Sequence, residues 1–214
     1  MTVVRDPVKE AEADAAIAKD VARFGVKIES PWDFVGQSSL EKKILELTDP
    51  RIIEVLASHL DVNHPYIVLE GVVFALGKLE ARPFAFDRLL HLILKHGEHP
   101  TGQSAAHAFN KMLLPQDSEI LSGLILNPTL RHASGLFVDP YVKLKRKDAI
   151  PVLRKALLSQ FNGPKLRATK ALAKLNDQES RPEFSKMAQS TDPDLKRAGK
   201  DALKRLDAKL SKAN

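Results

Sequence analysis

A short motif recurs along the chain at a nearly constant interval. Five copies begin 33, 32, 31 and 31 residues apart, and each ends with Lys or Arg followed by Leu or Met. This period indicates a repeat protein, in which every unit buries its apolar face against its neighbours. A weaker sixth copy, KILEL at 43–47, has Glu46 in place of the basic residue. The five copies are ALGKL at 75–79, AFNKM at 108–112, PYVKL at 140–144, ALAKL at 171–175 and ALKRL at 202–206.

Each of the five copies closes a segment that opens with a proline. Proline suits the first turn of a helix, because the N–H that it lacks would have no partner there. Between these segments lie others with apolar residues at helical spacing, as in Ile52, Ile53, Leu56 and Leu60. The sequence therefore predicts a series of helical hairpins, whose second helices open at Pro65, Pro100, Pro128, Pro164 and Pro193.

The paired helices with a proline-opened second helix resemble the HEAT-like repeat family in its short bacterial form. The resemblance is carried by residues 64–79, 162–175 and 192–206 and covers about 49–208. The repeated segments of the chain are similar to the repeats of phycobilisome-lyase-type HEAT-like proteins. The resemblance implies an all-α fold, a right-handed α-α superhelix (HEAT-like solenoid) of about five hairpins in one structural domain. The expected repeats are 49–81, 82–114, 115–146, 147–176 and 177–208, with a tail at 209–214.

A solenoid has two ends that must be covered, and residues 1–48 are the candidate for the first. We expect an irregular helical cap there, with Trp32 and Phe34 packing over the end of the stack. The alternative for Trp32 is a stacking platform for a base or ligand. One helical stripe of this cap is predicted to consist of Val8, Ala11, Ala15, Ala18 and Ala22.

The third repeat departs from the pattern because Pro140 falls inside its second helix. A proline there removes a backbone hydrogen bond and clashes with the preceding turn. The helix that begins at Pro128 should therefore kink or stop near Val138. Such a break is either a drifted repeat or a built site, and the most basic run of the chain, KLKRK at 143–147, follows it directly.

Composition and motifs give no support to a catalytic function. The chain has no cysteine, which removes disulfides, thiolate metal sites and cysteine nucleophiles. It also lacks the GxSxG, HExxH and GxGxxG signatures. We therefore expect a non-enzymatic protein with no catalytic residue and no cofactor.

Two weaker features have ordinary structural explanations. Six of the seven histidines lie between 59 and 107, and His96, His99 and His107 would have to converge in space to bind a metal. No spacing there places two imidazoles on one helix face, so no metal site is expected. The acidic pairs Asp177 with Glu179 and Asp192 with Asp194 precede helices and are interpreted as caps.

The positive charge is concentrated in the last third of the chain. The net charge is +6, while residues 141–214 carry nineteen basic and eight acidic side chains. This asymmetry indicates an acidic partner, whereas single lysines near helix ends also complement the helix dipole. The candidate partner-binding residues are Lys143, Lys145, Arg146, Lys147, Arg167, Lys170, Lys174, Lys196, Arg197, Lys200, Lys204 and Arg205.

These observations favour a protein-binding module or inhibitor, of adaptor or toxin-neutralising type, that holds an acidic protein on a basic concave surface. The alternatives are a protein that binds the phosphate backbone of nucleic acids, a HEAT-like DNA glycosylase, and a subunit of a cofactor-attaching lyase. No stretch is apolar enough for a membrane span. We expect a cytoplasmic monomer without membrane contact.

Overall fold

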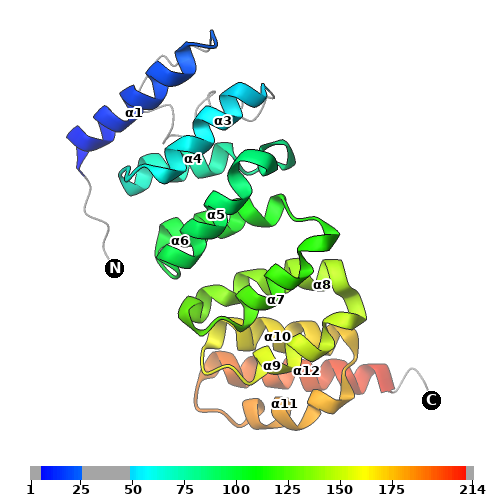
Figure 1. Ribbon diagram of the computed structural model, residues 1–214. Helices are drawn as coiled ribbons and strands as arrows, with labels where there is room; N and C mark the ends of the chain where they lie inside the picture. The colour runs from blue at the N-terminus through cyan, green and yellow to red at the C-terminus, as the bar shows by residue number, and fades with distance from the viewer. Residues whose placement is uncertain (1–5, 26–48, 211–214) are drawn as a thin grey trace. The chain divides into compact units, whose positions relative to one another are not determined.

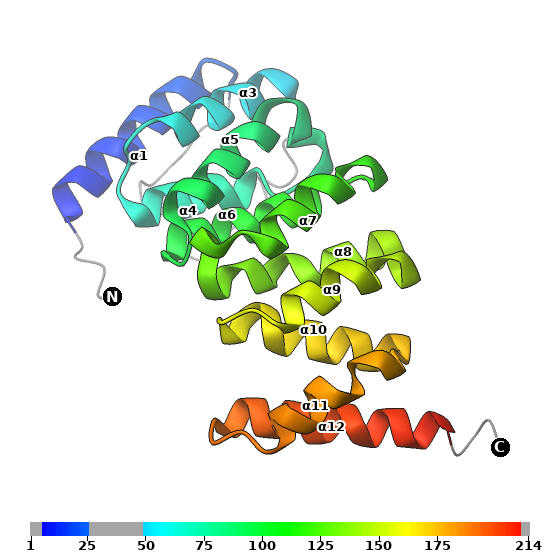
Figure 2. The ribbon, with the colours of Figure 1, turned by 60° about the horizontal axis from the view of Figure 1, so that its bottom comes forward.

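The computed structural model describes residues 6–25 and 49–210, and these residues form helices and turns without a strand. The all-helical prediction is therefore confirmed. Trp32 and Phe34 lie outside the described residues. Contacts divide the chain into two compact units, Met1–Leu113 and Leu114–Asn214, whose helices are labelled in Figures 1 and 2.

The first unit contains α1 (Pro7–Ala22), α3 (Pro50–Ser58), η2 (His59–Asp61), α4 (Tyr66–Ala75), η3 (Leu79–Ala81), α5 (Arg82–His96) and α6 (Pro100–Lys111). The second unit contains η4 (Pro115–Asp117), α7 (Ser118–Leu126), η5 (Pro128–Phe137), α8 (Val138–Lys145), η6 (Arg146–Ala149), α9 (Ile150–Leu157), α10 (Asn162–Leu175), η7 (Gln178–Ser180), α11 (Arg181–Ala188) and α12 (Pro193–Leu210). The η elements are 3-10 helices.

Local capping explains why several helices begin where they do. The Asp49 side chain accepts a hydrogen bond from the Arg51 N–H at 3.0 Å, at the start of α3. The Asp192 carboxylate accepts from the N–H groups of Asp194 and Leu195 at 2.9 and 3.1 Å, at the start of α12. These bonds satisfy N–H groups that have no partner within the helix. Caps of the same kind are formed by His99 before α6 and Asn127 before η5.

The N-terminal helix α1 buries a different face from the predicted one. Ile17 and Val21 are fully buried, whereas Val8 is 67% exposed. The predicted stripe is wrong, because alanines are too small to select a packing face against the larger Ile17 and Val21. The face that turns inward also carries two carboxylates, Glu10 and Asp14.

In the second unit, helices approach one another closely where glycine is present. A Cβ atom added to Gly163 would lie 2.1 Å from the carbonyl oxygen of His132, and one added to Gly135 would lie 2.7 Å from the Gly163 carbonyl carbon. Both distances are far below van der Waals contact. The absence of side chains at these two positions therefore lets η5 lie directly against the start of α10.

The chain around Pro140 confirms the predicted break and shows its form. The segment from Pro128 is a 3-10 helix with a non-helical residue at Arg131, and a new α-helix begins at Val138. Pro140 consequently lies in the first turn of α8 and not in a helix interior. There its ring displaces no intrahelical hydrogen bond.

Candidate functional site

The predicted basic residues lie mainly on three neighbouring helices of the second unit, α8, α10 and α12. Helix α10 contacts both of the others. The Asn162 side chain bonds Asp192 at 2.8 Å near the starts of α10 and α12. The Lys209 Nζ donates to the carbonyl oxygen of Lys174 near their ends, also at 2.8 Å. These two bonds show that α10 and α12 run in parallel, a direction that Figure 2 also shows, and the two helices contact each other.

Helix α10 presents three of the predicted residues to solvent. Arg167, Lys170 and Lys174 are exposed, while Ala168 and Leu172 on the opposite side are fully buried. Their spacing of three, four and seven residues places them on one side of the helix. The three cations thus form a single exposed stripe, as their sequence spacing predicts.

A groove of about 600 Å³ lies between α10 and α12. Three predicted residues line it, namely Lys170 from α10 and Arg197 and Arg205 from α12. The short side chains of Ala173, Ala198 and Ala202 also line it and leave space between the helices. The remaining lining residues are Leu166, Asp194 and Asp201.

The two carboxylates of this groove, Asp194 and Asp201, are functional candidates that the sequence analysis missed. Asp194 was interpreted as a cap, and in the structure its carboxylate pairs with Arg197 at 2.8 Å. Asp201 lies two turns further along the same side of α12. The number of charges in a segment does not identify these two carboxylates as groove residues. The orientation of α12 about its own axis, relative to α10, decides which side chains enter the groove.

The α12 lysines do not all belong to this groove. Lys200 lies two residues after Ala198 and is therefore directed about 160° away from it around the helix axis. Lys196 lies one turn before Lys200, on the same side. Both lysines are exposed and line neither the groove nor its rim on α10. They lie on the side of α12 that is directed away from the groove, which we call its outer side.

The basic run KLKRK is spread over two elements. Lys143 is exposed on α8, one turn after Asp139, whose carboxylate pairs with Arg167 of α10 at 2.8 Å. Lys143 therefore lies on the side of α8 that turns toward α10. Lys145 is half-buried at the end of α8, while Arg146 and Lys147 are exposed in η6. Arg146 has a φ of 50°, a backbone conformation that favours glycine.

We call the exposed cations on this side of the three helices the basic face. It carries two exposed ion pairs, Arg167 with Asp139 and Arg197 with Asp194. Exposed pairs of this kind contribute little to stability and exchange readily with other partners. The basic face consists of Lys143, Arg167, Lys170, Lys174, Arg197, Arg205 and Lys204, which lies two turns after Arg197 on α12 without lining the groove.

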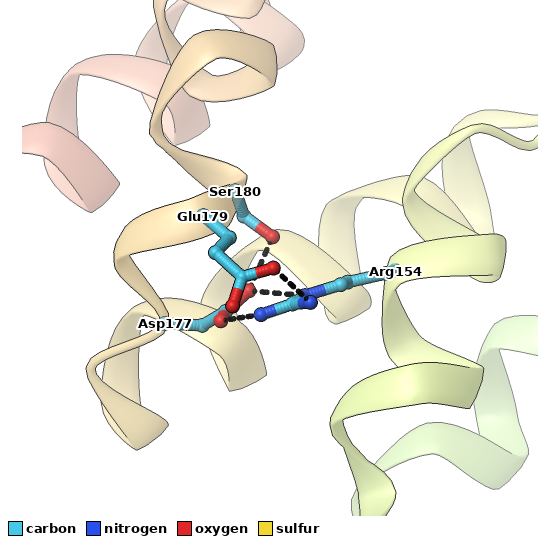
Figure 3. A network of polar contacts seen from close by, with 4 residues as sticks. All are labelled: Arg154, Asp177, Glu179 and Ser180. Carbon is cyan, nitrogen blue, oxygen red and sulfur yellow. Dashed lines mark hydrogen bonds and ion pairs between the residues drawn. The ribbon is translucent and has the colours of Figure 1, made fainter.

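A second polar cluster in this unit links two hairpins (Figure 3). Arg154 of α9 binds both carboxylate oxygens of Asp177, through Nε at 2.9 Å and through Nη2, and it also binds Glu179. The Ser180 hydroxyl donates to Asp177 Oδ2 at 2.6 Å. Asp177 and Ser180 are both buried, whereas Glu179 is exposed, so the buried carboxylate of Asp177 is the centre of the link. Asp177 directly precedes η7, as predicted for a cap, but its side chain makes the ion pair with Arg154 and no capping hydrogen bond.

The histidines of the first unit do not assemble a metal site. The rings of His96 and His99 lie 5.9 Å apart between centroids, and His107 is exposed on α6. Within residues 6–25 and 49–210, no group of three or more histidine or acidic side chains is placed to hold a metal ion. The His99 ring nitrogen Nδ1 instead accepts a hydrogen bond from the Thr101 N–H at 3.2 Å.

The chain matches no protein-family model and no curated protein. Among the helices described, none is both long enough and apolar enough to cross a membrane. The groove and the basic face are therefore the features of this chain that indicate a function.

Proposed function

We propose that this protein is a non-enzymatic binding module whose groove between α10 and α12 docks an acidic segment of a partner protein. The observation that carries the proposal is the groove itself, which combines the cations Lys170 and Arg205 with small apolar side chains. Neither cation has an ion-pair partner among the described residues. Each is therefore available to a carboxylate of the partner without first breaking an internal contact.

The shape of the groove sets the size of the segment. Asp194 and Arg205 mark its two ends on α12, and eleven residues of helix span about 16 Å. This length accommodates three turns of a helix or about five residues of an extended chain. Contacts to Leu166, Ala198 and Ala202 would supply affinity, while the cations steer the approach.

The mixed charge of the surface favours a protein over a nucleic acid. Asp139, Asp194 and Asp201 lie among the cations of the basic face or in the groove. A polyphosphate places one negative charge after another along its length and would be repelled by these carboxylates. A protein segment carries acids and bases at separate positions and can match both kinds of group.

The wider proposal concerns the architecture that presents this groove. We infer that the hairpins stack as a right-handed, HEAT-like α-α superhelix, in which second helices such as α8, α10 and α12 form the binding surface. The 31- to 33-residue period and the parallel course of α10 and α12 support it. A cytoplasmic, monomeric adaptor or inhibitor is the role that this proposal gives the chain.

The proposal is tested by a matched pair of charge reversals on the full chain. The double variant Lys170→Glu, Arg205→Glu changes the groove, while Lys196→Glu, Lys200→Glu makes the same change of charge on the outer side of α12. Binding to a labelled peptide, with glutamates and one lysine on the same side of a three-turn amphipathic helix, is measured by fluorescence anisotropy. We expect the groove variant to lose at least tenfold in affinity and the outer variant less than threefold.

Three outcomes would overturn this function. Equal losses in both variants would show a response to net charge alone, and no saturable binding of the peptide would remove the site. A random-sequence DNA duplex that binds the parent chain more tightly than the peptide, with affinity that falls steeply between about 50 and 200 mM salt, would replace the protein partner by a nucleic acid. Circular dichroism and thermal melting verify that both variants remain folded.

A further inference from the structure

A second pocket lies in the first unit, far in sequence from the groove and independent of the proposed function. Its volume is about 290 Å³, which is close to the lower limit for pockets that bind small molecules. Four elements meet around it: the turn after η2, the start of α4, the end of α5 and the start of α6. No residue of the basic face takes part in it.

One part of the pocket wall is apolar. Leu60, Leu69 and Leu92 line it, and each side chain is at least 95% buried. They come from η2, α4 and α5, so the apolar surface is fixed by the packing of three separate elements. Such a wall suits the apolar body of a ligand, because burying both surfaces together removes them from water.

The polar part of the wall contains histidines whose rings differ in their hydrogen-bond partners. The His99 ring caps α6, and the His64 ring is bonded through Nε2 to His59 Nδ1 at 2.9 Å. His59 is buried, and its Nε2 lies 3.4 Å from a carboxylate oxygen of Asp20. This chain of contacts fixes the orientation of His64. None of the described residues hydrogen-bonds to the His96 ring, which is half-buried at the pocket.

The electrostatic environment of the pocket favours an anion. Lys95, beside His96 on α5, lines it and has no ion-pair partner among the described residues. Burial lowers the pKa of His96, and the positive charge of Lys95 lowers it further, so the ring is neutral at pH 7 and can contact a carboxylate through its N–H group. The acidic residue among the lining groups, Asp61, is already paired with Arg88 at 2.8 Å. The positive end of the α6 dipole also meets the pocket at His99 and Thr101.

We propose that this pocket binds a small organic carboxylate with a compact apolar body. Lys95 and the His96 ring hold the carboxylate, and the His64 ring supplies a further polar contact. The apolar body lies against Leu60, Leu69 and Leu92. This arrangement needs both halves of the ligand, since the carboxylate alone leaves the apolar wall in water and the apolar body alone leaves Lys95 without a partner.

The test uses three probes of graded chemistry on the full chain. Benzoate has both features, benzyl alcohol has a similar body without charge, and acetate has the charge without the body. Binding is followed by the ring signals of histidine-labelled protein in ¹H–¹³C NMR spectra, assigned with His→Gln variants. We expect benzoate to shift the His64 and His96 signals saturably at millimolar concentration, with at least fivefold weaker binding of benzyl alcohol and acetate.

Variants on one helix provide the matched comparison. Lys95→Gln removes the charge, and His91→Gln alters an exposed histidine of the same helix that does not line the pocket. Benzoate should bind Lys95→Gln at least fivefold more weakly and His91→Gln within twofold of the parent. The proposal is overturned if Lys95→Gln binds like the parent, if benzyl alcohol binds as tightly as benzoate, or if the signals of exposed His91 and His107 shift as much as those of His64 and His96.

Discussion

Arg154 and Asp177 form a bidentate ion pair that joins α9 to the segment after α10 (Figure 3). The carboxylate is 95% buried, so its charge has little contact with water. Two hydrogen bonds from the guanidinium and one from the Ser180 hydroxyl take the place of that water. The contact therefore fixes the spacing of two neighbouring hairpins by satisfying a charge that would otherwise be costly to bury.

Removing this charge should destabilise the second unit. We expect Asp177→Asn to lower the free energy of unfolding by about 2 kcal/mol, because hydrogen bonds to a charged group are lost in a buried place. Urea denaturation at pH 7 measures the change. Asp139→Asn removes the exposed pair with Arg167 and serves as the control, with a much smaller expected effect. Equal losses in the two variants would contradict the structural role of Asp177.

The same carboxylate gives a pH dependence of defined sign. Burial by itself would raise the pKa of Asp177, but the hydrogen bonds from Arg154 and Ser180 outweigh it and hold the pKa below 3.8. The stability that Asp177 contributes is therefore present above pH 3.8 and is lost as the pH falls through the lowered pKa. The difference in stability between the parent and Asp177→Asn should shrink steadily below about pH 4. If the stability difference between the parent and Asp177→Asn stayed constant down to pH 2, the predicted pH dependence would be refuted.

Asp14 on α1 should give stability the opposite pH dependence, with a loss as the pH rises. Burial, assisted by the charge of Glu10, raises the pKa of Asp14 to about 6, and one carboxylate oxygen lacks a hydrogen-bond partner. Its favourable contribution is complete below pH 3.8 and is lost as the pH rises through 6. We expect Asp14→Asn to be more stable than the parent at pH 7.5 by about 1 to 2 kcal/mol, allowing for solvent screening, and to match it at pH 4.

Thermal melts across pH 4 to 8 provide the measurement for Asp14. Glu12→Gln, two residues earlier and exposed on the same helix, is the control and should leave the pH profile of the parent unchanged. A parent chain whose stability does not decline between pH 4 and 7.5 relative to Asp14→Asn would show that the burial of this carboxylate has no energetic effect.

Two glycines offer a sharp contrast in packing. Gly163→Ala should destabilise the second unit by at least about 3 kcal/mol, because the new Cβ would meet the His132 carbonyl at 2.1 Å and backbone cannot move aside cheaply. Gly123→Ala, in α7 with nothing within 4 Å of the new Cβ, should raise stability by about 1 kcal/mol through helix propensity. Chemical denaturation of both variants tests the pair. A Gly163→Ala variant as stable as the parent would disprove the close approach.

Arg146 supplies a test of backbone strain. Its φ of 50° is costly for a residue with a side chain and free for glycine. We expect Arg146→Gly to raise the free energy of unfolding by about 1 kcal/mol, after the greater freedom of glycine in the unfolded chain is counted. Lys147→Gly, at the next position and without a positive φ, should instead lower stability. The prediction fails if both substitutions lower it alike.

Much of the fold follows from local features of the sequence. The helices begin at the expected prolines or within two residues of them, and Asp192 forms the expected cap, because both effects act within a few residues. The break before Val138 was predictable for the same reason. For the candidate site, sequence identified Lys170, Arg197 and Arg205 as cations and the Arg167, Lys170, Lys174 stripe as one exposed side of a helix.

The sequence by itself thus determined the secondary structure, the repeat period and the concentration of positive charge, since hydrogen bonding, capping and spacing are properties of short stretches of chain. Only the tertiary structure decided which side of each helix meets a neighbour. That choice buried Ile17 instead of the alanine stripe on α1, brought Asp201 into the groove and directed Lys200 away from it. The physical reason is that a helix can rotate about its axis without losing a hydrogen bond, so side-chain packing between helices fixes its orientation.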